Sequence, residues 1–145
     1  DLLQDHVSFT GQVDNDQVCH YYQMADVFVS ASDSETQGLT YDEALASDLP
    51  IVVMRSEYTD ELIDDPAIGR SFQKRADLVD GVLEYLATPP SPEAIAKRRE
   101  KLHDISAEVF GQRVLDFYRV CQEEVAEKKR PGFGRRFRHL RNQND

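Results

Sequence analysis

The sequence predicts an α/β fold in which a Rossmann-like parallel sheet is flanked by helices. Two apolar runs, VFVSAS at 27–32 and PIVVM at 50–54, are too short for helices and are typical of buried strands. Around them lie segments in which apolar residues recur every three or four positions, as in amphipathic helices. Strands that alternate with helices predict a parallel sheet, because parallel neighbours need a long crossover connection.

The elements follow one another regularly along the chain. A β-favouring run at 7–10 ends at Gly11, and N-cap candidates at 14–16 begin a helix that reaches Ala25. Further strands are expected at 27–32, 50–54 and 70–72, and further helices at 38–47, 59–63, 76–86, 92–103 and after Ser106. An apolar stripe on the last helix is expected to pack on the domain body, and it comprises Phe110, Val114, Phe117, Cys121 and Val125.

Charge is distributed unevenly within a net charge of -10. Residues 128–145 hold seven basic residues and one acidic residue, so the preceding body is strongly acidic. A nucleic-acid-binding domain spreads its basic residues over a folded face, and we therefore expect no nucleic-acid partner. No run approaches the roughly 20 apolar residues of a membrane span, and the first residues lack the features of a signal peptide, so a soluble chain is expected.

No metal site or cofactor is expected from the residues that commonly bind metals. The four histidines and two cysteines do not stand at ligand spacing. Cys19 and Cys121 fall beside apolar neighbours on predicted helices, which favours reduced core thiols.

The segment SASDSETQGLTYDEALA at 30–46 is the candidate binding site. Ligands of open α/β sheets bind beyond the carboxyl ends of the strands, and this loop follows such an end. A helix that begins near Gly38 would present free N–H groups to a diphosphate, and carboxylates at Glu35 and Glu43 would accept hydrogen bonds from sugar hydroxyls. Alternatively, Glu43 is a solvated helix residue and Glu35 an acid favoured by the helix dipole.

The order and spacing of several short blocks extend this interpretation. Glu35, seven intervening residues and then EALA, after ADVFVSAS and before DLPIVV, resemble the donor-binding half of retaining GT-B glycosyltransferases of family 4. FTGQVDND at 9–16 resembles the same family. The resemblance implies contacts of Glu35 with the transferred hexose, of Glu43 with the ribose and of Gly11 and Val13 with the base. It also implies that the diphosphate and sugar face the backbone N–H groups of Gly38, Leu39 and Thr40.

Longer stretches are similar to bacterial diacylglycerol glucosyltransferases, which move glucose from UDP-glucose onto a membrane lipid. These stretches are SETQGLTYDEALA, RSEYTDELIDDPAIGRSF and ISAEVFGQRVLDFY. The resemblance implies a partial C-terminal domain of a GT-B fold at 1–127, without its first strands and with C-terminal helices, followed by a basic tail at 128–145. The family's basic pair and its N-terminal histidine are absent, so the chain alone is expected to be inactive.

The basic tail is expected to lie on an anionic bilayer, which would place the protein in the cytoplasm as a peripheral protein on the inner face of the plasma membrane. The residues expected at the membrane are Lys128, Lys129, Arg130, Arg135, Arg136 and Arg138. A disordered solubilising end, or a tail that folds back on the acidic body, explains the same composition.

Three classes of function remain open from the sequence. The first is a hexosyltransferase that uses a UDP-sugar donor and a lipid acceptor, or a family 4 enzyme with a polysaccharide or protein acceptor. The second is a sugar-nucleotide-binding module without activity of its own, and the third is a doubly wound protein-interaction domain.

Overall fold

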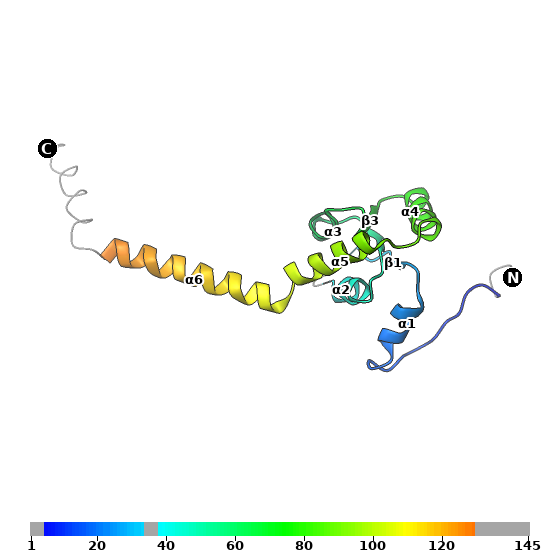
Figure 1. The fold of residues 1–145 in the computed structure, drawn as a ribbon, viewed down its shortest axis with the longest axis horizontal. Coiled ribbons are helices and arrows are strands. Elements are labelled where there is room, and N and C mark those ends of the chain that lie inside the picture. Colours follow the sequence, from blue (N-terminus) through cyan, green and yellow to red (C-terminus); the bar gives the residue numbers. More distant parts are fainter. Residues whose placement is uncertain (1–4, 34–37, 130–145) are drawn as a thin grey trace. The chain divides into compact units, whose positions relative to one another are not determined.

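The structure is a computed structural model that describes residues 5–33 and 38–129, the side chains of 128 and 129 excepted. The chain divides into two compact units, Asp1–His103 and Asp104–Asp145. Figure 1 shows the short strands of the first unit enclosed by helices, and a single long helix in the described part of the second.

The first unit contains a three-stranded parallel sheet. Its strands are β1 (Phe28–Ser30), β2 (Ile51–Met54) and β3 (Gly69–Phe72), and they lie side by side in that order. In the register, Val52 lies opposite Val29 on one side and opposite Arg70 on the other. The predicted fold class, a parallel α/β sheet with flanking helices, is therefore confirmed.

The helices occupy the segments between and after the strands. They are α1 (Val18–Met24), α2 (Leu39–Ala46), α3 (Glu57–Leu62), α4 (Arg75–Ala87), α5 (Pro92–Asp104) and α6 (Ala107–Lys129). The first helix begins later than the N-cap candidates at 14–16 predict, because the backbone there forms a turn in which Gln17 N donates to Asp14 O at 2.9 Å.

The core lies between the sheet and the helices on one of its faces. Ile51 and Val53 are fully buried in a cluster with Tyr41 of α2. Successive side chains of a strand point to opposite faces, and Val52 accordingly points away from this cluster. It lies against α4, where a Cβ added to Gly81 would meet Val52 Cγ1 at 3.2 Å. Helices thus cover both faces of β2.

Two predictions for the N-terminal part are wrong. No strand forms at 7–10, and Phe9 is 94% exposed. β-favouring composition does not make a strand without a neighbour to pair its backbone N–H and C=O groups. Cys19 is exposed, because α1 buries none of its residues completely, so it is not a core thiol.

Basic side chains hold α5 against the loops that precede β2 and β3. Arg98 is 2% exposed, and it donates through Nε to Ala67 O at 2.7 Å and through Nη1 to Asp48 O. The neighbouring Arg99 pairs with the Asp48 carboxylate at 2.7 Å. These contacts lie at the amino ends of the strands, so α5 leaves the opposite, carboxyl edge of the sheet to α2 and α3.

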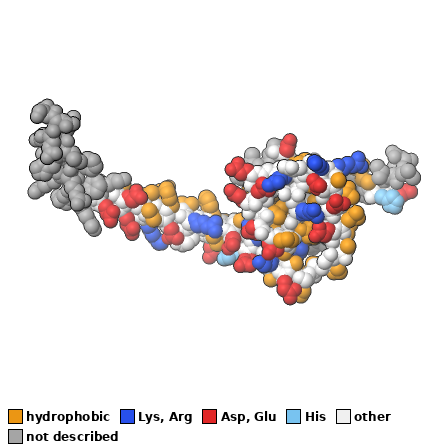
Figure 2. Space-filling view, turned by 90° about the horizontal axis from the view of Figure 1, so that it is seen from above, with side chains coloured by type: hydrophobic (Ala, Val, Ile, Leu, Met, Phe, Trp, Pro, Cys, Tyr) orange, Lys and Arg blue, Asp and Glu red, His pale blue; other side chains and the backbone are white. Residues whose placement is uncertain are grey.

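The second unit presents apolar side chains along α6. Phe110, Phe117 and Val125 are 66%, 66% and 50% exposed, and Figure 2 shows hydrophobic side chains along one side of this helix. Packing of this stripe on the domain body stays a prediction. Within the described ranges, no helix combines the length and the apolar character needed to cross a membrane.

Candidate functional site

The start of α2 lies at the carboxyl edge of the sheet, just after the loop that follows β1. Gly38 is its N-cap residue, with a left-handed φ of 60°, and no side chain of the described residues caps the helix. The first N–H groups of a helix have no acceptor within the helix, and this applies to those of Leu39 and Thr40. The predicted helix start is confirmed, and its predicted contacts with a ligand stay predictions.

Tyr58 of α3 fills the space beside Gly38. A Cβ at Gly38 would collide with Cε1 of the Tyr58 ring, which also stacks on Tyr41 with ring centroids 6.2 Å apart. The first turn of α3 is fixed by a capping box, in which Thr59 N donates to Ser56 Oγ at 3.1 Å and Ser56 N donates to Thr59 Oγ1 at 2.8 Å. The starts of α2 and α3 therefore lie close together at this edge.

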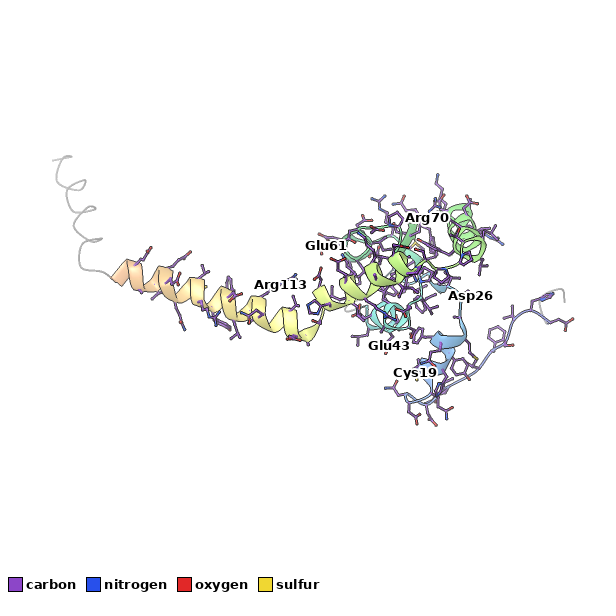
Figure 3. All side chains as sticks on the ribbon, viewed as in Figure 1. Cys19, Asp26, Glu43, Glu61, Arg70 and Arg113 are labelled. Atoms are coloured by element: carbon purple, nitrogen blue, oxygen red, sulfur yellow. The ribbon has the colours of Figure 1, made fainter. Side chains whose placement is uncertain are left out.

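Glu43 stands one turn beyond the start of α2 and faces α1 (Figure 3). It is exposed, and its Oε2 accepts a hydrogen bond of 3.0 Å from the Tyr22 hydroxyl. Burial, this hydrogen bond and the negative charge of Glu43 together raise the pKa of Tyr22 to about 12. Tyr22 thus stays protonated at neutral pH and remains a hydrogen-bond donor to the carboxylate.

Asp42 is the neighbouring acid on α2, and it is partly buried. Its Oδ1 is enclosed without a hydrogen-bond partner in the described structure. Burial first, and then the charge of Glu43, raise the pKa of the Asp42 carboxyl above its ordinary value. A raised pKa in the folded state means that the ionised form opposes folding, so this group's contribution to stability is full at acid pH and falls as the pH rises through the folded-state pKa.

We expect Asp42→Asn to raise the free energy of unfolding at pH 7 by about 1 kcal/mol, because the substitution removes a charge whose enclosed oxygen has no partner. The gain should shrink as the pH approaches 3.8, the ordinary pKa of aspartate. Urea unfolding followed by tyrosine fluorescence at pH 4 and pH 7 measures it. Asp80→Asn, an exposed change on α4, is the control, and an equal gain in both variants would contradict the argument.

Of the two residues predicted to contact a nucleobase, Val13 lines a hollow of about 360 Å³ between the N-terminal segment, α1 and β1. The ring of Tyr22 lines the same hollow, and its hydroxyl reaches Glu43. Gly11 does not line it, but is exposed with a φ of 68°. Val13 therefore shares this hollow with the tyrosine that contacts Glu43, whereas Gly11 is not one of its lining residues.

Other predicted site residues lie outside the described residues. They are Glu35 of the loop and Arg130, Arg135, Arg136 and Arg138 of the tail. Lys128 and Lys129 form the last turn of α6 in the backbone. Among the described residues, no cluster of three histidine, cysteine or acidic side chains could hold a metal ion.

These features define an α/β domain in which a helix start without a side-chain cap, followed one turn later by a carboxylate, lies at the carboxyl edge of a parallel sheet. The sequence model of the family described as Glycosyl transferases group 1 matches residues 1–102, and the chain belongs to this family. The predicted resemblance to GT-B glycosyltransferases is confirmed.

Three curated relatives match large parts of the chain. It is 46% identical to an alpha-monoglucosyldiacylglycerol synthase of Streptococcus pneumoniae over 80% of this chain, and 40% identical to one of Acholeplasma laidlawii over 66%. It is 33% identical to the sulfoquinovosyl transferase SQD2 of Arabidopsis thaliana over 72%. The matches cover 26%, 24% and 18% of these relatives, so the chain spans about a quarter of their length or less. No solved structure matches the chain.

Sequence reasoning missed Tyr22 as a partner of Glu43. The helical spacing marks Tyr22 as one of several apolar positions on α1, and Glu43 lies 21 residues further along the chain. Only the packing of α1 beside α2 reveals the contact. A tyrosine among the apolar positions of an otherwise exposed helix is the one local signal, because its hydroxyl requires a polar partner when buried.

Proposed function

We propose that the full-length protein is a retaining hexosyltransferase that transfers glucose from UDP-glucose to a membrane lipid such as diacylglycerol. This chain supplies the donor-binding part. The observation that carries the proposal is the uncapped start of α2 with Glu43 one turn further on, in a chain of the group 1 family. Two relatives are named as synthases of a glucosylated diacylglycerol, and these names support a lipid acceptor.

The proposed binding mode places one sugar nucleotide across the loop and α2. The hexose lies at Glu35, the diphosphate and sugar lie over the N–H groups of Gly38, Leu39 and Thr40, and the ribose lies at Glu43. Support comes from the partial positive charge of a helix N-terminus, which favours a diphosphate. The hollow lined by Val13 suits the flat apolar faces of a base.

In the proposed reaction the bond between the anomeric carbon and the diphosphate breaks, the acceptor oxygen bonds to that carbon on the same face of the sugar, and the acceptor's hydroxyl proton passes to the leaving diphosphate. Negative charge develops on the leaving diphosphate. The N–H groups at the start of α2 are fixed by the fold before the reaction, so they stabilise this charge without reorganisation. The proposal includes no cofactor and no metal ion.

The basic tail is proposed to bind the inner face of the plasma membrane. The net charge of +6 over 128–145 would draw the protein to anionic lipids and thereby to its acceptor. This places the full-length protein in the cytoplasm as a peripheral membrane protein.

In the full-length protein, we expect Glu43→Gln to lower kcat/KM for UDP-glucose by about tenfold to a hundredfold. A neutral amide replaces a charged acceptor, and hydrogen bonds to charged groups contribute about 1.5–3 kcal/mol. The measurement is transfer of labelled glucose from UDP-glucose to diacylglycerol in mixed vesicles. Parallel reactions with polysaccharide and protein acceptors test the alternative acceptors.

Glu61→Gln is the matched control, because Glu61 is an exposed glutamate of α3 on the same unit (Figure 3) and should leave transfer unchanged. Equal kcat/KM values in Glu43→Gln and Glu61→Gln would show that Glu43 is not part of the donor-binding site. Transfer to another acceptor class but not to diacylglycerol would contradict the proposed lipid acceptor.

A further inference from the structure

Tyr22 is the one residue whose side chain connects the hollow beside α1 with the carboxylate of Glu43 in the described structure. Its ring lines the hollow, and its hydroxyl donates to Glu43 Oε2 at 3.0 Å. Its hydroxyl has no other hydrogen bond in the described structure. The direction of this bond is defined, since an ionised carboxylate can only accept.

The ring of Tyr22 is itself fixed to the core. It packs on Phe28 of β1 with ring centroids 5.8 Å apart, and Phe28 packs on Tyr41 with centroids 6.0 Å apart. Tyr41 is fully buried and precedes Glu43 by two residues on α2. The hydroxyl of Tyr22 is therefore held at a defined position relative to the backbone that carries Glu43.

A glutamate side chain on an exposed helix face samples many rotamers. A ligand that binds only one of these rotamers loses affinity, because binding must then cost the side chain its conformational entropy. The bond from Tyr22 selects a rotamer before the ligand arrives. It uses one of about four acceptor positions on the carboxylate, so the others stay available to a vicinal pair of hydroxyls. The Tyr22 hydroxyl is protonated throughout the neutral range, since even the ordinary tyrosine pKa of 10.0 lies well above it.

We propose that Tyr22 is a positioning residue, which orients the Glu43 carboxylate toward the ribose hydroxyls of the donor nucleotide. This inference rests on the proposed function, in which Glu43 binds the ribose. Tyr22 acts through Glu43 and does not itself contact the ribose. Loss of its hydroxyl should therefore weaken recognition of the ribose hydroxyls and leave recognition of the rest of the nucleotide intact.

The test compares UDP with 2′-deoxy-UDP in binding to the 145-residue chain, measured by amide chemical-shift titration. Tyr22→Phe keeps the ring and removes only the hydroxyl. We expect wild type to prefer UDP, and Tyr22→Phe to reduce this preference by about threefold to tenfold, which corresponds to the ordering of one side chain. Glu43→Gln should abolish the preference. Tyr118→Phe, on α6, should retain it.

The ratio of the affinities for UDP and 2′-deoxy-UDP distinguishes a positioning role of Tyr22 from a merely structural one. Partial unfolding would weaken the binding of both nucleotides equally and leave this ratio unchanged. An unchanged preference in Tyr22→Phe, together with a lost preference in Glu43→Gln, would overturn the role of Tyr22 and leave the proposed function standing. An unchanged preference in both variants would overturn the ribose contact of Glu43. Absence of binding of either nucleotide to wild type at millimolar concentration would overturn both.

Discussion

Replacing Gly38 with alanine is expected to lower the free energy of unfolding by about 3 kcal/mol. The residue has a φ of 60°, at which a Cβ costs about 1–2 kcal/mol. The new Cβ would also collide with the ring of Tyr58, and such overpacking typically costs a further 1–3 kcal/mol. Urea unfolding followed by tyrosine fluorescence measures the loss, because Tyr41 and Tyr58 report on this part of the core.

Gly11→Ala is the matched control for this prediction. Gly11 has a similar φ of 68°, but nothing lies within 4 Å of the Cβ that alanine would add. It should therefore lose only the conformational part, about 1 kcal/mol. Equal losses in the two variants would show that the contact between Gly38 and Tyr58 contributes nothing, and the close approach of α3 to α2 would lose its support.

The second large effect is expected at Arg98. Arg98→Ala should lower the free energy of unfolding by about 3 kcal/mol, because it removes a buried side chain and leaves the partly buried carbonyl oxygens of Asp48 and Ala67 without their donor. It also removes the packed stem of the side chain from beneath α5. The same urea titration measures the change.

The adjacent Arg99 supplies the control for Arg98. It is 68% exposed in its ion pair with Asp48, and exposed pairs contribute at most about 1 kcal/mol. Arg99→Ala should therefore destabilise the protein by no more than this. A loss in Arg99→Ala as large as that in Arg98→Ala would mean that the ion pair with the Asp48 carboxylate, and not the hydrogen bonds of the buried Arg98, holds α5.

Local patterns predicted the elements that form the site. The run at 50–54 predicted β2 because a continuous apolar run suits a strand buried on both faces. The predicted helix start near Gly38 is also correct, and the structure adds that Gly38 has a left-handed φ of 60° there. The run at 7–10 misled the prediction, since its composition resembles a strand although no neighbouring strand pairs with it. Composition indicates what a segment can form, and pairing decides the outcome.

Contacts between distant residues could not be predicted from the sequence. Tyr22 and Glu43 are 21 residues apart, and Arg98 lies 50 residues from Asp48. In the sequence Arg98 is one of several charged residues of α5, and nothing in the spacing distinguishes the buried arginine from its exposed neighbour Arg99. In the sequence Asp42 is likewise indistinguishable from a surface acid, and only the structure shows that its Oδ1 is enclosed without a hydrogen-bond partner among the described residues.

The start of α2 and Glu43 are proposed to bind a sugar nucleotide. Titration of the isotopically labelled chain with UDP-glucose, followed by amide chemical shifts, tests it most directly. We expect the largest shifts at Gly38, Leu39, Thr40 and Glu43 and smaller ones at Val13, with no change along α6. Absence of shifts at 38–43 at millimolar UDP-glucose, or shifts confined to other parts of the chain, would contradict it.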